Sequence, residues 1–176
     1  IPWEKKSQRF DYILGNPPFI GKQHQNGEQK SDIDLIWAGV NGSGVLDYVT
    51  CWYIKAAQYI NIHSPQAERN IDENGTKVAF VSTNSITQGE QVSILWSELS
   101  NKHKIKIHFA HRTFNWSNEA RGKAAVHVVI IGFSNFDISE KYLYEYETVK
   151  AEPHERKAKN INPYLVEASD LIILKR

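Results

Sequence analysis

The chain has 176 residues, of which 41% are hydrophobic and 23% are charged, and its 21 basic residues nearly balance its 20 acidic ones. These values are ordinary for one globular domain, and they exclude a disordered or collagen-like chain. No apolar run approaches the roughly 20 residues that a bilayer span requires, which excludes a membrane protein. The single cysteine, Cys51, cannot form an internal disulfide, so a reducing, cytoplasmic setting fits best. Because the chain contains no methionine and begins with Ile1, we expect a processed or excised piece of a longer protein.

The positive charge is concentrated in one stretch. Residues 101–133 hold six basic residues and one acidic residue, whereas the rest of the chain holds 15 basic and 19 acidic ones. A locally basic surface suits a polyanion. The first three basic residues alternate with isoleucines, and we interpret them as the solvent face of a strand: Lys102, Lys104 and Lys106. For the other three, plain solvent exposure and polyanion binding both stay open: Arg112, Arg121 and Lys123.

In chain order, the first predicted element is a buried strand over Phe10–Leu14. It ends abruptly, because the prolines that follow cannot donate to a sheet ladder and push the preceding residue into extended geometry. Residues 20–44 are polar and lack sustained periodicity, so we expect a long mobile loop, which in a compact domain is usually functional. Apolar residues at helical spacing then predict an amphipathic helix that begins at Leu46 and ends before Ser64-Pro65.

The next segments are predicted to complete the sheet. Lys77–Thr83 has the composition of a strand, and Thr87 with Glu90 three residues on matches a capping box in front of a second helix. The apolar stripe of that helix consists of Val92, Leu95, Trp96 and Leu99. Two more strands follow, of which the second is apolar and β-branched and suits the centre of a sheet: Lys104–Ala110 and Ala124–Phe133.

The order strand, helix, strand, helix, strand, strand predicts an α/β fold. Its sheet starts with parallel crossovers and finishes with an antiparallel hairpin. Lys141–Val149 is expected to add an extended segment, and Lys150–Pro163, which is polar and contains two prolines, is expected to form a connector. We therefore divide the chain into residues 1–134, the main α/β unit, and residues 135–176, the extended segment and connector.

The most specific motif is Asn16-Pro17-Pro18-Phe19, which directly follows the first predicted strand. At average composition, an Asn-Pro-Pro triplet occurs by chance in only about a few per cent of chains of this length. The carboxyl end of a strand is also where open α/β sheets bind ligands. Asn-Pro starts turns without any functional reason, however, so the motif alone leaves a plain turn and a catalytic loop equally open.

Residues 10–19, with the sequence FDYILGNPPF, resemble the catalytic motif of S-adenosylmethionine-dependent amino-methyltransferases that act on adenine in DNA. Later segments are similar, in order, to the helix after the catalytic loop, the next strand, the late hairpin and the lead-in to a target-recognition domain of the large single-chain restriction-modification enzymes. These segments are Leu46–Ala57, Val78–Ser85, His111–Phe133 and Ala158–Leu165. The resemblance spans roughly residues 10–168, and such an ordered set is far more specific than any one segment.

The resemblance implies that this chain is the catalytic half of a Rossmann-like class I methyltransferase sheet. In this family a glycine-rich turn after the first strand carries the methionine part of the cofactor. Only nine residues precede Phe10, and none of them is glycine. We therefore expect the first three strands and the main cofactor loop to be missing with an N-terminal half, and a recognition domain to be missing beyond the C-terminal end. This piece alone is expected to be inactive.

The motif suits the chemistry that the resemblance implies. The adenine amine is a poor nucleophile because its lone pair is delocalised into the ring. The Asn16 amide oxygen and the Pro17 main-chain carbonyl can each accept one of its N–H groups and so direct the lone pair at the sulfonium methyl. Pro17 and Pro18 stiffen the loop beforehand. Phe19 is expected to stack on the adenine, which must be flipped out of the duplex, and the stack is worth roughly 1–3 kcal/mol.

Other candidate site residues follow from the resemblance. An aromatic residue in the late hairpin forms the other side of the base pocket, and Trp116 is preferred over Phe114, although both lie in a predicted connector and can equally cap the core. Trp52 matches a helix position at the adenine end of the cofactor site, but its helical spacing favours core packing. Asp11 is a further cofactor candidate, and Asp47 flanks the site or simply supplies negative charge to a helix N-terminus.

We therefore interpret the sequence as part of an adenine-N6 DNA methyltransferase from a restriction-modification or phage-defence protein. Its expected partners are S-adenosylmethionine and a DNA duplex with a flipped adenine, contacted by Arg112, Arg121 and Lys123. The seven histidines show no metal-ligand spacing, so no metal is expected. The alternatives are a methyltransferase that acts on an RNA base or a protein glutamine, which share the Asn-Pro-Pro-aromatic motif, and a non-catalytic nucleic-acid-binding module.

Overall fold

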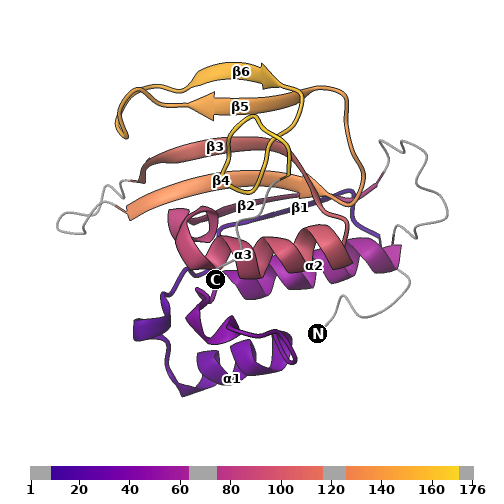
Figure 1. The fold of residues 1–176 in the computed structure, drawn as a ribbon, viewed down its shortest axis with the longest axis vertical. Helices are drawn as coiled ribbons and strands as arrows, with labels where there is room; N and C mark the ends of the chain where they lie inside the picture. The colour runs from indigo at the N-terminus through magenta and orange to yellow at the C-terminus, as the bar shows by residue number, and fades with distance from the viewer. Residues whose placement is uncertain (1–8, 64–74, 117–125, 171–176) are drawn as a thin grey trace.

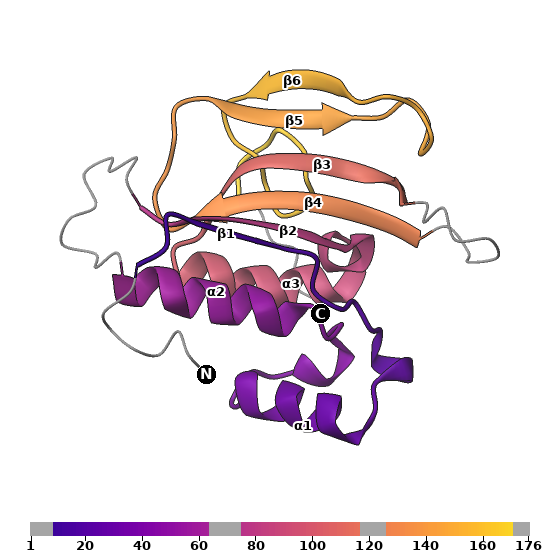
Figure 2. The same ribbon diagram turned by 180° about the vertical axis from the view of Figure 1, so that it is seen from behind.

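The computed structural model describes residues 9–63, 75–116 and 126–170. They form one six-stranded sheet in the order β1-β2-β4-β3-β5-β6, and helices α2 and α3 lie side by side against one of its faces (Figure 1 and, from behind, Figure 2). The strands are β1 (Tyr12–Gly15), β2 (Lys77–Thr83), β3 (Lys106–Trp116), β4 (Val126–Ser134), β5 (Lys141–Glu145) and β6 (His154–Ala158). The longer helices are α1 (Gly27–Ile36), α2 (Thr50–His63) and α3 (Gly89–Ser97), accompanied by the short helical segments η2 (Lys22–His24), η3 (Ser43–Val45), η5 (Asn84–Thr87) and η6 (Glu98–Lys102). None of the described helices is long and apolar enough to cross a membrane.

The directions of the strands bring several carboxyl ends to one edge of the sheet. β1 pairs in parallel with β2, and β3 pairs in parallel with β5. β4 runs antiparallel to both β2 and β3, so β1, β2, β3 and β5 all point the same way. The parallel start, the antiparallel hairpin of β3 and β4, and the central place of β4 confirm the predicted α/β topology. The segments that follow β1 and β2 therefore leave the sheet at the same edge as the end of β3.

The hydrophobic core lies between the sheet and the helices α2 and α3. In β2 every second residue is buried, and Phe80 from this strand meets Phe133 of β4 at a centroid distance of 5.9 Å. Tyr53 of α2 stacks on Phe133 at 5.3 Å, and its hydroxyl hydrogen-bonds to Ser82 Oγ at 2.8 Å. The apolar stripe predicted for the second helix is buried in α3 and η6: Val92, Leu95, Trp96 and Leu99.

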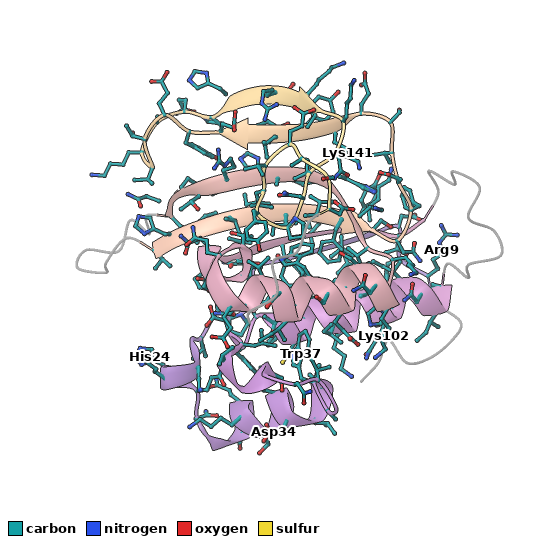
Figure 3. The ribbon with its side chains drawn as sticks, viewed as in Figure 1. Arg9, His24, Asp34, Trp37, Lys102 and Lys141 are labelled. Carbon is teal, nitrogen blue, oxygen red and sulfur yellow. The ribbon has the colours of Figure 1, made fainter. Side chains whose placement is uncertain are left out.

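The prediction of a long loop over residues 20–44 is wrong in one respect, because the segment contains the helix α1. The Asn26 side chain accepts the Gln29 N–H and the Gln29 side chain accepts the Asn26 N–H, both at 2.9 Å, which closes a capping box. Within α1 only Ile33 is buried, and the buried Trp37 after it points toward the layer formed by α2 and α3 (Figure 3). Since so few apolar residues carry the packing, α1 has no stripe that periodicity can detect.

The capping box predicted at Thr87 and Glu90 does not form. Thr87 ends η5, where its hydroxyl donates to the Asn84 carbonyl at 2.9 Å. α3 begins two residues later at Gly89, and its N-cap residue makes no side-chain hydrogen bond. The short hydroxyl prefers this local backbone acceptor, because η5 turns the chain directly at the end of β2.

The strand predicted over Lys104–Ala110 begins at Lys106 and continues to Trp116. Its pairing with β4 contains two register shifts, one between Ile107 and Phe109 and one between His111 and Phe114. Phe114 and Trp116 therefore lie at the carboxyl end of β3, and the prediction that they lie in a connector is wrong. Of the three lysines interpreted as the face of a strand, only Lys106 belongs to the strand.

The segment after residue 134 adds two strands to the same sheet. β5 confirms the predicted extended segment, but the connector predicted for Lys150–Pro163 contains β6, which pairs antiparallel with β5. Four of the five residues of β6 are exposed, and Lys157 of this strand pairs with Glu140 at 2.7 Å. A polar edge strand has no buried face for alternation to reveal. The division of the chain at residue 134 stays a prediction.

Candidate active site

The Asn-Pro-Pro-Phe motif leaves the sheet at the carboxyl end of β1. Asn16 and Pro18 are exposed, Pro17 is buried, and the ring of Phe19 is half-buried against the hydrophobic core. Within the part of the chain that the structure describes, no hydrogen bond engages the Asn16 side chain. The motif therefore combines an anchored backbone with an amide that is accessible to a ligand.

A groove of about 460 Å³ runs between β1 and α2, and Asn16, Pro17 and Pro18 of the motif line it, whereas Phe19 does not. Its walls include apolar side chains from both elements and from β2, among them Ile13, Ala56 and Phe80. Gly15 closes the end of β1 tightly, since a Cβ at this position would lie 3.3 Å from the Phe80 ring. Because Gly15 has no side chain, the backbone that leads into the motif can lie close to the Phe80 ring.

Trp52 reaches the same groove from α2. Its half-buried ring meets Tyr48 edge to face, with a centroid distance of 5.0 Å and an interplanar angle of 84°. Trp52 also packs against the hydrophobic core. The structure therefore brings Trp52 and Asn16 to one groove, and core packing and a role in binding are compatible for this residue.

Asp11 is not brought to the motif. It is exposed and precedes β1, and its carbonyl accepts the Lys77 N–H at 2.9 Å where β2 begins. The length of β1 separates Asp11 from Asn16, and five steps of about 3.3 Å per residue amount to roughly 17 Å. Asp11 therefore lies at the opposite edge of the sheet from the other candidate residues.

A buried amide fixes the chain just after the motif. Gln25, which is 8% exposed, donates through Nε2 to the carbonyls of Ile20 at 3.1 Å and Leu46 at 2.9 Å. The Tyr48 N–H donates to the same Ile20 carbonyl at 2.9 Å. Residues 46–49 are thus held against the loop, and α2 begins at Thr50 rather than at the predicted Leu46. Sequence reasoning missed Gln25, because a glutamine in a polar stretch carries no distinctive signal.

The aromatic candidates lie at the same edge as the motif, three strand spacings of about 4.8 Å away from β1. Phe114 is half-buried and stacks on Tyr146 at 5.1 Å with an interplanar angle of 18°. The Tyr146 hydroxyl hydrogen-bonds to His111 Nδ1 at 2.7 Å, and burial lowers the pKa of His111. Trp116 remains 37% exposed. Phe114 therefore belongs to a packed aromatic cluster, whereas the ring of Trp116 has surface available for a ligand.

The basic candidates are only partly described. Arg112 is exposed and pairs with Glu145 of β5 at 3.1 Å. Arg121 and Lys123 lie outside the described residues. Because exposed ion pairs contribute only about 0–1 kcal/mol, Arg112 can exchange its carboxylate partner for a phosphate at little cost.

The described residues support neither a metal site nor a cysteine nucleophile. Within the ranges 9–63, 75–116 and 126–170, no group of three or more histidine, cysteine, aspartate or glutamate side chains is placed to hold a metal ion. Cys51 is buried, and this burial raises the pKa of its thiol to about 12. Since the thiolate is the reactive form, Cys51 is not a nucleophile near neutral pH.

Comparisons with known proteins agree with this arrangement. The model of the MmeI DNA-methyltransferase domain matches residues 1–145. The chain is 43% identical over 166 residues to DNA methyltransferase A of Bacillus subtilis strain 168, which covers 94% of this chain and 17% of that protein. It is also similar to the solved structure of the Type IIL restriction-modification enzyme MmeI in complex with DNA, with a TM-score of 0.82 and 54% identity over 94% of this chain and 21% of that chain.

This chain therefore spans about a fifth of the length of these two relatives. The close structural match confirms the predicted Rossmann-like class I methyltransferase fold. The family model covers most of the chain, including the motif and the strands β1 to β5. The chain belongs to the family of MmeI DNA-methyltransferase domains.

Proposed function

We propose that this chain carries the base pocket of an enzyme that transfers a methyl group from S-adenosylmethionine to the N6 amine of an adenine in DNA. The observation that carries the proposal is the position of Asn16–Phe19, which follows β1 at the edge where open α/β sheets bind ligands, with Asn16, Pro17 and Pro18 lining a groove there. The whole enzyme is proposed to be a cytoplasmic restriction-modification or phage-defence protein, since a similar solved structure is a restriction-modification enzyme in complex with DNA.

The motif supplies two acceptors for the two N–H groups of the amine. The Asn16 amide is exposed, and the second acceptor is the main-chain carbonyl of the buried Pro17. When both N–H groups are engaged, the nitrogen lone pair is turned toward the methyl donor. The rings of Pro17 and Pro18 fix φ near −65°, so these acceptors are positioned before the base arrives.

The groove between β1 and α2 fits the nucleoside end of the cofactor. Its walls are apolar at Ile13 and Phe80, and Trp52 offers a flat ring beside the motif. When bound, S-adenosylmethionine supplies a methyl group on a positively charged sulfur. We assign its methionine end to a glycine-rich turn in an N-terminal half of the enzyme. The strands of that half would pair along the outer edge of β1, where Tyr12 and Leu14 are 66% and 75% exposed.

Phe19 and Trp116 are assigned to the two faces of the flipped base. Trp116 is preferred over Phe114 because Phe114 is already stacked on Tyr146. Base stacking worth roughly 1–3 kcal/mol offsets the few kcal/mol that flipping the base costs. Contacts to the DNA backbone are assigned to Arg112, Arg121 and Lys123.

Identification of the product tests the proposal. The full-length enzyme is incubated with tritium-labelled S-adenosylmethionine and, in separate reactions, with unmethylated duplex DNA, ribosomal RNA and a glutamine-containing protein. We expect label in DNA alone, and digestion of that DNA to nucleosides should release N6-methyldeoxyadenosine. Label in RNA or protein, or a methylated cytosine in DNA, would contradict the proposal.

A further inference from the structure

A buried carboxylate stands at the edge of the sheet where β1 and β2 end. Asp47 lies just before α2 and is 7% exposed, and its Oδ2 accepts a hydrogen bond from Ser85 Oγ. Ser85 lies in η5, directly after β2, and its hydroxyl also lies 3.1 Å from Thr83 Oγ1. One side of the Asp47 carboxylate is therefore bound to the exit of β2.

The other side of the same carboxylate faces the chain that leaves the motif. A Cβ on Gly21 would lie 3.3 Å from Asp47 Oδ1, so Gly21 and the carboxylate are in close contact. The next residue, Tyr48, donates its N–H to the Ile20 carbonyl at 2.9 Å. Ile20 and Gly21 directly follow Phe19. Asp47 thus bridges the exits of two neighbouring parallel strands, one of which carries the motif.

Stability alone does not call for an anion at this position. No ion pair to Asp47 occurs among the described residues, and its backbone N–H is held separately by Gln91 Oε1 at 2.9 Å. Burying a carboxylate without a cationic partner costs free energy, which a neutral side chain of the same shape would avoid. The Asp47 carboxylate does, however, set the distance between the two segments that it joins, because it accepts from Ser85 after β2 and packs against Gly21 after the motif.

We propose that Asp47 and Ser85 are positioning residues that hold the Asn16–Phe19 loop at its working distance from the end of β2. This inference rests on the proposed function, because the groups that they position are the Asn16 amide and the Pro17 carbonyl. Neither Asp47 nor Ser85 is assigned a contact with substrate. A displacement of about 1 Å at a reacting centre can cost about a hundredfold in rate, so a small shift of this loop is measurable.

Paired substitutions in the full-length enzyme test the bridge, with tritium-labelled S-adenosylmethionine and unmethylated duplex DNA. Ser85→Ala and Asp47→Ala are expected to lower kcat about 10- to 100-fold while KM for DNA changes less than about twofold. Asp47→Asn keeps an acceptor for the Ser85 hydroxyl and should recover most of the activity. The matched controls are Ser93→Ala, which removes a half-buried hydroxyl that donates to the Glu90 carbonyl within α3, and Asp34→Ala, which removes an exposed carboxylate that points outward (Figure 3); both should leave kcat unchanged.

Gly21 offers a second way to disturb the same bridge without touching its polar groups. Its φ of −61° is open to any residue, so the new methyl of Gly21→Ala acts only through its contact with Asp47 Oδ1. We expect kcat to fall, whereas Gly27→Ala, which meets no atom within 4 Å, should not change it. This variant keeps the test decisive if Asp47→Ala proves too unstable to assay.

The decisive measurement combines Asp47→Ala with Asn16→Ala. If Asp47 acts through the motif, removing it from an enzyme that already lacks the Asn16 amide should lower kcat by a smaller factor than in the unmodified enzyme, because only the Pro17 carbonyl is left to be positioned. The same loss of kcat in both backgrounds, or a loss confined to KM for DNA, would overturn the inference. A normal rate for Asn16→Ala alone would instead refute the proposed function, so the two failures are distinguishable.

Discussion

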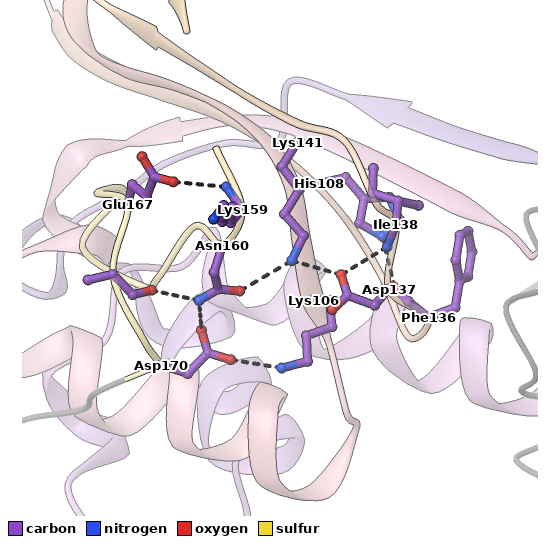
Figure 4. Close-up of polar contacts among 11 residues, drawn as sticks. Lys106, His108, Phe136, Asp137, Ile138, Lys141, Lys159, Asn160, Glu167 and Asp170 are labelled. Carbon is purple, nitrogen blue, oxygen red and sulfur yellow. Dashed lines mark hydrogen bonds and ion pairs between the residues drawn. The ribbon is translucent and has the colours of Figure 1, made fainter. Parts of the chain in front are cut away.

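Lys141 offers a sharp test of how polar groups hold the segment after β6. Its side chain is 1% exposed, and Nζ lies 2.7 Å from Asp137 Oδ1 and 3.2 Å from Asn160 Oδ1 (Figure 4). Asn160 in turn donates to Asp170 Oδ1 at 2.7 Å, and Asp170 pairs with Lys106 of β3 at 2.8 Å. The buried Lys141 and the more exposed Lys106 therefore both join residues 159–170 to the sheet.

Removing the anion should cost more than removing the cation. Asp137→Ala leaves the Lys141 ammonium buried without its carboxylate, which for a fully buried pair costs about 3–5 kcal/mol. Since Asp137 is 57% exposed and water replaces part of the contact, we expect a loss of about 2 kcal/mol. Lys141→Met removes the buried charge and keeps most of the volume, so the expected change is less than about 1 kcal/mol in either direction.

Hydrogen–deuterium exchange of the full-length enzyme, read by mass spectrometry on peptides from β5 and residues 159–168, measures these local effects. A loss of about 2 kcal/mol in local stability corresponds to exchange that is about 30-fold faster, since each 1.4 kcal/mol is tenfold. Equal acceleration by Lys141→Met and Asp137→Ala would refute the reasoning, because it would mean that packing rather than charge pairing stabilises this segment.

Three further results are expected. Trp116→Ala should weaken binding to a duplex with a mismatched target base about tenfold more than binding to an ordinary duplex, because only a flipped base meets the ring. An equal loss for both DNAs in a fluorescence anisotropy titration would mark Trp116 as a core residue. Gly132→Ala would place a Cβ 2.1 Å from the Phe109 ring, and the resulting overpacking of β4 should cost about 1–3 kcal/mol; an unchanged melting temperature would contradict this. Burial lowers the pKa of His108, so the unfolded chain binds more protons below about pH 6.5 and stability should fall as the pH drops from 7 to 5. His108→Phe should flatten that dependence in urea titrations, and an undiminished acid sensitivity of the variant would exclude His108 as its source.

The sequence predicts best those elements that bury one regular face. β2 spans the predicted Lys77–Thr83 because its residues alternate between the core and the opposite face, and the stripe of α3 is visible because its apolar residues recur at helical spacing. α1 and β6 escape prediction for the opposite reason. α1 buries only Ile33, and β6 is held by backbone pairing with β5 and by exposed ion pairs, neither of which leaves a hydrophobic pattern.

The position of the motif could also be predicted, because two prolines after an apolar run mark the end of a strand. The groups around it could not. The contact between Asp47 and Ser85 joins residues 38 apart in the chain, and Gln25 meets Leu46 across 21 residues. Such contacts depend on which loops the parallel order of β1 and β2 brings together. Asp11 illustrates the converse. It is close to the motif in sequence, but it lies at the other end of β1 because the strand between them is extended.

The central claim is that the Asn16 amide orients the amine that receives the methyl group. It is tested most directly by the rate of methyl transfer to unmethylated DNA by Asn16→Ala, measured in the full-length enzyme beside Asn41→Ala, which removes an exposed amide from the link between α1 and η3. We predict that Asn16→Ala lowers kcat at least about a hundredfold with folding intact, the scale of losing one preorganised electrostatic group, while Asn41→Ala stays within about twofold of the unmodified enzyme. Near-normal turnover by Asn16→Ala would contradict the account.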